Sequence, residues 1–139
     1  MKPKTTVIRQ KAIIPAATSQ VYEAFVDSKK HTEFTGSKAT GKPIVGNKFT
    51  AWDGYIMGKY IEIEKGKRLV QEWMTTDWPH GYAPSKLELT FTDRGEDTEV
   101  ALLQHDVPVE QADELKQGWI DFYWEPLKNY FKKQKPLRK

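Results

Sequence analysis

The hydrophobic positions of the chain change their period near Pro15. From Thr5 to Ile14, β-branched residues are common and the run stops at Pro15, which is typical of a strand. Beyond the proline, Val21, Ala24 and Phe25 fall at i, i+3 and i+4, which predicts a short amphipathic helix. The chain therefore begins with a strand that leads into a helix.

A second short helix is predicted directly after the first. It begins at Asp27 or Ser28 and runs to Phe34, because Gly36 provides the residue that commonly ends a helix. The two helices separate the first strand from the remaining strand-like segments.

From Ser37 onward, turn signals recur at the spacing of hairpins. One weak strand is predicted near Ser37 to Gly41. Five stronger strands are predicted between the turns, over Lys48 to Trp52, Tyr55 to Glu64, Arg68 to Thr75, Lys86 to Asp93 and Thr98 to His105. In the fourth of these, Leu87, Leu89 and Phe91 alternate with polar residues, so one face of the sheet is dry and needs a cover.

The cover is predicted to be a long helix over about Val109 to Phe131, with acidic residues in its first turns and lysines at its end. At about 100° per residue, one broad apolar stripe runs along it. The stripe contains Ala112, Leu115, Trp119, Tyr123, Pro126 and Tyr130, flanked by Ile120, Phe122 and Leu127. Pro126 predicts a kink, because proline removes a helical hydrogen bond. The expected fold class is α+β, a curved antiparallel sheet packed against this helix.

Length and charge distribution narrow the range of partners. The 139 residues fit a single domain, 1–139. The net charge of +3 comes from a basic tail, residues 132–139, which holds five Lys or Arg and no acid. The other 131 residues carry 17 basic and 19 acidic groups, a net of −2, so the body is not basic and no nucleic-acid partner is expected.

Cysteine is absent, which excludes disulfides and thiolate chemistry. No apolar stretch at the N-terminus has the length of a signal peptide or a membrane span. We therefore expect a cytoplasmic protein that has no membrane partner.

The sequence also predicts no enzyme. His31, His80 and His105 lie in different predicted elements, and none has a second ligand at metal-binding spacing. The serines lack a nucleophile-elbow pattern, and no glycine-rich phosphate loop occurs. No catalytic residue, metal or cofactor is expected.

Several motifs together resemble a known family. They are Phe49 to Trp52 with Asp53-Gly54 and Gly58, Leu69 to Trp73 with Trp78-Pro79, Leu87 to Phe91 with Thr98 to Val100, and Val107-Pro108 leading to Gln117-Gly118-Trp119. With the order of elements, they resemble the START-like (SRPBCC) superfamily, in its branch named for activators of heat-shock protein 90 ATPase (AHSA-type). The likeness runs from about Thr6 to Phe131 and is greatest to the C-terminal domain of the eukaryotic co-chaperone.

The resemblance implies a helix-grip fold and a non-enzymatic module that binds a heat-shock protein 90 family chaperone. The co-chaperone's N-terminal domain supplies its principal chaperone contact, and this chain is expected to lack that domain and to stimulate the ATPase little. Exposed aromatic residues of a loop could serve as anchors for the chaperone. The candidates are Trp78, His80 and Tyr82.

A second reading remains open, in which the protein is a carrier or sensor of a small apolar ligand. Five Trp, six Tyr and six Phe can enclose a cavity between sheet and helix. The candidate lining residues are Trp73, Phe91, Trp119 and Tyr123. Simple packing of the same rings as core is the structural alternative.

Overall fold

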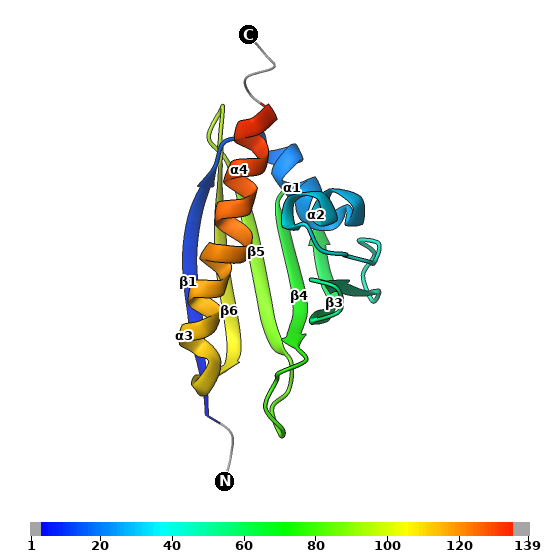
Figure 1. Ribbon diagram of the computed structural model, residues 1–139, viewed down its shortest axis with the longest axis vertical. Helices are drawn as coiled ribbons and strands as arrows, with labels where there is room; N and C mark the ends of the chain where they lie inside the picture. Colours follow the sequence, from blue (N-terminus) through cyan, green and yellow to red (C-terminus); the bar gives the residue numbers. More distant parts are fainter. Residues whose placement is uncertain (1–3, 135–139) are drawn as a thin grey trace.

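An antiparallel sheet of six strands forms the centre of the molecule. The computed structural model describes residues 4–134, and Figure 1 shows a long helix lying along one face of the sheet. The strands are β1 (Thr5–Ile14), β2 (Lys48–Ala51), β3 (Ile56–Glu64), β4 (Arg68–Thr75), β5 (Ser85–Asp93) and β6 (Thr98–Pro108). Their order is β1-β6-β5-β4-β3-β2, so β6 lies between the first strand and β5. The predicted α+β helix-grip fold is confirmed.

Two short helices, α1 (Thr18–Val26) and α2 (Ser28–Thr35), connect β1 to β2 as predicted. The Asp27 carboxylate caps α2 by accepting hydrogen bonds from the backbone N–H groups of Lys29 and Lys30, at 2.9 and 3.2 Å. Gly36 ends α2 in the left-handed conformation, with φ of 81°. Both helices lie near one end of the sheet, beside the C-terminal helix (Figure 1).

The prediction of a strand near Ser37 to Gly41 is wrong. Only an isolated bridge forms there, in which Thr40 and Thr50 exchange backbone hydrogen bonds of 3.0 and 3.1 Å. The segment cannot continue as a strand because Gly41 has φ of 108° and Pro43 follows it. The strands after the two short helices therefore number five in the described chain, β2 to β6.

The C-terminal helix is one long body with an irregular middle. It consists of η1 (Val109–Gln111), α3 (Ala112–Trp119), the π-helical η2 (Ile120–Trp124) and α4 (Glu125–Gln134). The irregularity predicted at Pro126 thus lies in the turn before it. There the Glu125 N–H donates to the Ile120 carbonyl, five residues back. The wider turn suits a proline, which has no N–H and crowds the carbonyl of the preceding turn.

The π-helical turn changes which side chains face the sheet. As predicted, Ala112, Trp119 and Tyr123 are buried. From the last residue of η2 onward, the buried residues are Trp124, Leu127 and Phe131, whereas the predicted Pro126 and Tyr130 are only half-buried. The extra residue in the π turn shifts the helical phase, so the stripe predicted at a constant 100° per residue is wrong in its second half.

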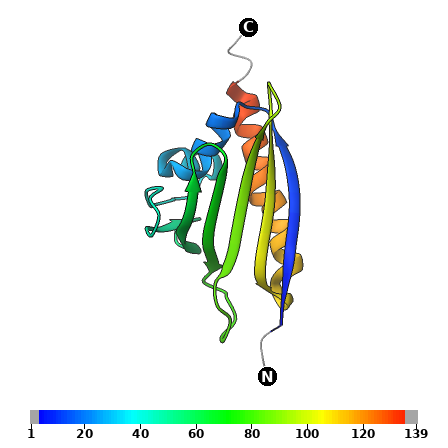
Figure 2. The same ribbon diagram turned by 180° about the vertical axis from the view of Figure 1, so that it is seen from behind.

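The dry face of the sheet lies under this helix. Leu87, Leu89 and Phe91 are buried there, while Glu88 and Thr90 between them lie on the opposite face. That opposite face carries no helix of the described chain (Figure 2). Within residues 4–134, none of the helices combines the length and the apolar character that a membrane span requires. Most of the basic tail predicted at residues 132–139 lies outside the described residues.

Candidate functional site

Three of the four predicted cavity residues meet where the helix crosses the sheet. The ring centres of Trp73 and Trp119 are 5.5 Å apart, and those of Trp119 and Tyr123 are 4.8 Å apart. All three side chains are at most 5% exposed. Phe91 lies elsewhere in the core, where it packs edge-on against Tyr22 and Phe25. The structure therefore brings Trp73, Trp119 and Tyr123 together and leaves Phe91 out.

A chain of buried hydrogen bonds holds this ring cluster in register. The Trp119 indole donates to Gln104 Oε1 at 3.0 Å, and Gln104 Nε2 donates to the Ser85 hydroxyl at 3.0 Å. Ser85 in turn donates to the Trp73 carbonyl at 2.6 Å. The chain links α3 to β6, β5 and β4, so it fixes both the helix position and the orientation of the Trp119 ring.

Tyr123 makes a second buried polar contact, with His31 of α2. The Tyr123 hydroxyl and His31 Nε2 are 3.0 Å apart, and His31 Nδ1 lies 3.1 Å from the Phe25 carbonyl. Because a carbonyl only accepts, Nδ1 carries the proton and Nε2 accepts from Tyr123. Burial lowers the pKa of His31, although the bond to Phe25 acts in the opposite direction. Burial likewise raises the pKa of Tyr123.

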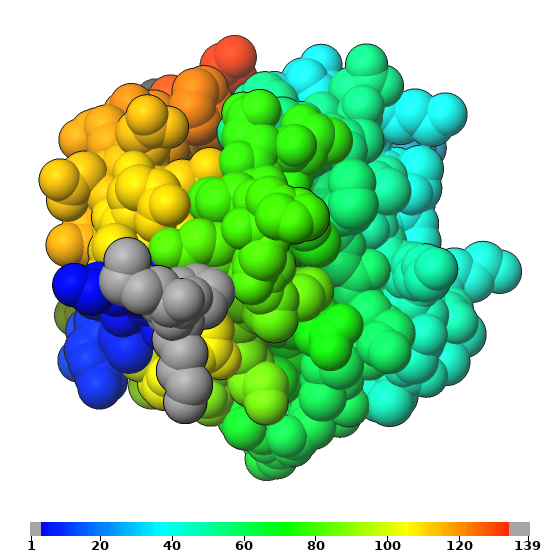
Figure 3. All heavy atoms as spheres, turned by 90° about the horizontal axis from the view of Figure 1, so that it is seen from below, coloured from blue at the N-terminus to red at the C-terminus, as the bar shows by residue number. Residues whose placement is uncertain are grey.

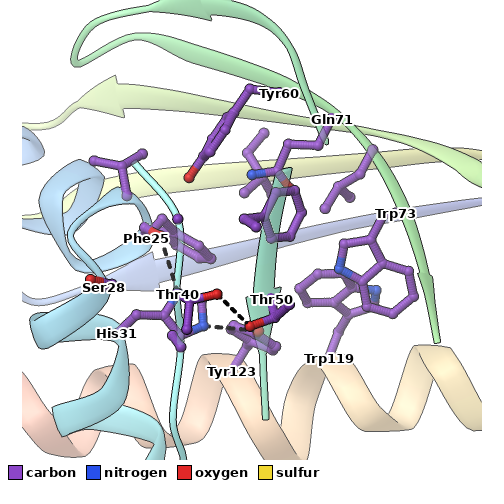
Figure 4. Close-up of a pocket in the computed structure, with 16 residues that line it drawn as sticks. Phe25, Ser28, His31, Thr40, Thr50, Tyr60, Gln71, Trp73, Trp119 and Tyr123 are labelled. Atoms are coloured by element: carbon purple, nitrogen blue, oxygen red, sulfur yellow. Dashed lines mark hydrogen bonds between the residues drawn. The ribbon is translucent and has the colours of Figure 1, made fainter. Parts of the chain in front are cut away.

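The space enclosed between sheet, α2 and C-terminal helix is small. Figure 4 shows this pocket, with Gln71 and Tyr60 on one side and His31 and Tyr123 on the other. Its volume is about 20 Å³, which is room for about one water molecule. The enclosed interior is therefore packed core, and it does not have the volume of a small apolar ligand.

A much larger groove is also lined by the same three rings. It lies between the turn that joins β2 to β3 and the C-terminal helix, and its volume is about 530 Å³. This size falls within the usual range of ligand sites, roughly 300 to 1,000 Å³. Its lining residues are Trp52, Tyr55, Ile56, Trp73, Thr75, Glu114, Leu115, Gln117, Gly118, Trp119, Asp121, Phe122 and Tyr123.

The outer wall of the groove consists of aromatic residues that the sequence analysis did not identify. Phe122 is 53% exposed and packs edge-on against Trp52, with ring centres 5.3 Å apart. Tyr55 is also exposed. Trp52 has φ of 53°, a left-handed conformation that is unfavourable for a bulky residue. One signal was available, because Phe122 flanks the predicted stripe and remains exposed when the stripe is buried.

The predicted partner-binding residues lie in the loop between β4 and β5. This loop projects beyond the sheet, at the end where β1 begins (Figures 1 and 2). Figure 3 looks onto this end of the molecule, with the loop region in its middle. His80 is exposed, and Tyr82 is half-buried with its hydroxyl donating to Glu110 at 2.8 Å.

Trp78, which was expected as an exposed anchor, is buried instead, with 9% of its surface exposed. Its ring packs edge-on against Trp73 at 6.1 Å, and its indole donates to the Ala83 carbonyl at 2.9 Å. The indole thus closes the loop onto itself and onto the core. Trp78 shapes the loop, while His80 is exposed to solvent and Tyr82 is partly exposed.

The family model and the curated relatives that match this chain carry the same description, activator of Hsp90 ATPase. The family model described as "Activator of Hsp90 ATPase homolog 1-like protein" matches residues 15–132. The human activator of 90 kDa heat shock protein ATPase homolog 1 is 28% identical over 131 residues, which cover 94% of this chain and 38% of that protein. The Dictyostelium discoideum homolog is also 28% identical, over 94% of this chain and 34% of its own length. The chain thus spans less than two fifths of these curated relatives.

Among solved structures, an HSP90 activator from Plasmodium falciparum superposes with a TM-score of 0.82. The alignment covers 90% of this chain and 95% of that one, at 22% sequence identity. At this identity the likeness shows the fold.

Proposed function

The chain belongs to the family of activator of Hsp90 ATPase homolog 1-like proteins, and from this membership we propose that it is a non-enzymatic module that binds a heat-shock protein 90 family chaperone. The observation that carries the proposal is the family match over residues 15–132, which includes every helix and strand from α1 to α3. The relatives are named for activating the chaperone's ATPase, so regulation of that enzyme is the activity we assign.

The loop between β4 and β5 is the surface we assign to the chaperone. Pro79 and Pro84 restrict its backbone, and the indole of Trp78 anchors it to the core. A loop that is already ordered loses little conformational entropy on binding. His80 and Tyr82 then present an imidazole and a phenol ring, and aromatic residues are frequent anchors in protein interfaces.

Binding is expected to be weak. The chain corresponds to less than two fifths of the curated relatives, so it offers only part of the surface that those proteins have. We propose a dissociation constant on the order of micromolar or weaker, with little stimulation of the ATPase by this module alone.

The test is a titration of the protein against a heat-shock protein 90 family chaperone, with binding and ATP hydrolysis measured in parallel. Tyr82→Ala and His80→Ala are expected to weaken binding several-fold each. Glu96→Gln is the matched control, because Glu96 is an exposed residue of the β5–β6 turn, away from the loop. A wild type that shows no binding at high micromolar concentration contradicts the proposal.

The groove supports a second candidate function, the binding of a small apolar ligand. The groove has the volume of a ligand site, and six aromatic residues line it. Three of the predicted cavity residues are among them. This candidate differs from the earlier expectation in its place, because the ligand enters the open groove and not the enclosed interior. In this candidate function, Trp73, Trp119 and Tyr123 contact the bound ligand.

A further inference from the structure

The groove between the β2–β3 turn and the C-terminal helix carries charge of one sign. Glu114 and Asp121 are among its lining residues, and none of the described residues that line it is Lys, Arg or His. Asp77 lies beside its mouth, where its carboxylate accepts a hydrogen bond of 2.9 Å from the Tyr55 hydroxyl. Burial raises the pKa of the Tyr55 phenol, and the carboxylates of Asp77 and Glu114 raise it further.

These carboxylates are not neutralised by other side chains of the described chain. Within residues 4–134, no ion pair involves Glu114, Asp121 or Asp77, and Asp121 accepts only a neutral hydrogen bond, from Gln117 at 3.0 Å. The acidic residues on the open face of the sheet behave differently. There Arg68 pairs with Glu62 at 3.0 Å and with Glu88 at 2.7 Å. The field at the groove therefore favours a cation.

The aromatic walls favour the same sign of charge. The face of an aromatic ring attracts a cation through its quadrupole, by about 0.5–1 kcal/mol at exposed sites. The exposed rings of Tyr55 and Phe122 stand on the solvent side of the groove, close to the carboxylates. The buried rings of Trp73 and Trp119 form the apolar floor. A ligand that satisfies both regions has an apolar body and a positively charged head.

We propose that the groove is a binding site for a small organic cation, in which an apolar body lies on Trp73 and Trp119 and an ammonium group lies between Glu114, Asp121 and the exposed rings. This assignment rests on the second candidate function and is independent of chaperone binding. It specifies that the ligand is positively charged and names the residues that recognise the charge.

The experiment uses three ligands with one ring system and different heads. They are 1-naphthylmethylamine, which is cationic at neutral pH, the uncharged 1-naphthylmethanol and the anionic 1-naphthoate. Binding to the full chain is followed by calorimetry and by NMR shifts of the indole N–H groups. The amine is expected to bind about tenfold more tightly than the naphthoate, with the alcohol between them.

Two kinds of variant test which residues cause the preference for the amine and where the ligands bind. The double variant Glu114→Gln with Asp121→Asn is expected to reduce the preference for the amine to the part that the rings supply, while the alcohol binds as before, and Glu96→Gln serves as the matched acidic control. Gly118→Leu fills the groove, because a side chain at Gly118 extends toward Phe122, whose ring lies 3.7 Å from a Cβ built there. It is expected to block all three ligands, with the fold checked by its thermal midpoint. Phe122→Ala, at an exposed position, is the second test should Gly118→Leu fold poorly.

The outcomes distinguish the existence of a ligand site from its preference for a cation. Equal affinity for amine and naphthoate overturns the charge assignment and leaves the ligand site in place. Failure of all three compounds to bind overturns the ligand site as well. Binding that survives both Gly118→Leu and Phe122→Ala places the site elsewhere and overturns the assignment.

Discussion

The hydroxyl of Tyr123 lies 3.0 Å from Nε2 of His31, and this contact joins α2 to the π-helical turn across 92 residues of sequence. Both side chains are buried, at 5% and 8% exposure. The imidazole is neutral, with its proton on Nδ1, because Nδ1 faces the Phe25 carbonyl and Nε2 accepts from the phenol. The contact links the helix pair to the same turn that contributes Asp121, Phe122 and Tyr123 to the groove.

Protonation of His31 is expected to destabilise the fold at mildly acidic pH. Burial lowers its pKa below the ordinary value of 6.5, so the unfolded chain binds the proton more readily than the folded one. Stability from this group is therefore fully present above pH 6.5 and decreases as the pH falls below it. Urea unfolding at about pH 7.5 and about pH 5.5 measures the decrease.

The control for that experiment is His31→Gln, which removes the titrating group. This variant is expected to be less stable at neutral pH but to lose much less stability on acidification than the wild type. His80→Gln, at an exposed position, should retain the slope of the wild type. An unchanged slope in His31→Gln would show that other groups cause the acid sensitivity.

Tyr123→Phe tests the other half of the pair. The substitution keeps the ring and removes the hydroxyl, which leaves a buried His31 nitrogen without a donor. The expected loss is about 1–3 kcal/mol in the free energy of unfolding. Tyr55→Phe is the matched control, because the Tyr55 hydroxyl is near the surface and bonds to Asp77, and its loss should be under about 1 kcal/mol. Equal losses in the two variants would contradict the buried role of Tyr123.

Much of the fold followed from the sequence because its signals are local. Turn residues at hairpin spacing gave the strands from β2 to β6, and the dipole-compatible charges gave the C-terminal helix. The π-helical turn at Ile120–Trp124 could not be predicted, because a hydrophobic pattern analysed at a constant helical period does not detect an added residue. For this reason Trp124 and Phe131 were missed as core residues.

The candidate site was only partly predictable. Trp73, Trp119 and Tyr123 could be grouped because each falls on a face that the pattern turns inward. Trp52, Tyr55 and Phe122 come from a turn and from the outer side of the helix, and only the folded chain brings them together. Trp78 was misread because its ring folds back onto Trp73 and its indole bonds to Ala83 within its own loop, and the sequence has no periodic signal for either contact.

Gly58 is expected to tolerate no side chain. A Cβ built there collides with the Glu72 carbonyl oxygen of β4, which belongs to the backbone and cannot move without disturbing the strand pair. Gly58→Ala should therefore cost about 3 kcal/mol or more. Gly118→Ala is the matched control, because its new methyl group makes only an ordinary contact and should be neutral or stabilising. Thermal unfolding of both variants gives the comparison, and a native-like Gly58→Ala would disprove the close approach.

Trp78→Ala and Tyr82→Ala are expected to separate loop structure from partner binding. Trp78 is buried against Trp73, so its removal should cost about 2–4 kcal/mol in stability and loosen the loop. Tyr82 is half-buried, and its removal should cost about 1 kcal/mol or less. Chemical unfolding is measured beside chaperone binding. A Trp78→Ala variant as stable as the wild type would contradict the anchoring role of the indole.

The hydrogen-bond chain from Trp119 through Gln104 to Ser85 is expected to stabilise the fold beyond the packing of the rings. Trp119→Ala removes a ring that is 3% exposed and should cost roughly 3–5 kcal/mol. Gln104→Leu keeps the volume but leaves the indole N–H and the Ser85 hydroxyl with one partner fewer, which should cost about 1–3 kcal/mol. Because both variants break the same bond, their losses should not add, and the double variant should be more stable than the sum predicts by about 1 kcal/mol or more. Urea unfolding of the two single variants and the double variant completes the cycle. Strict additivity would mean that the ring is held by packing alone.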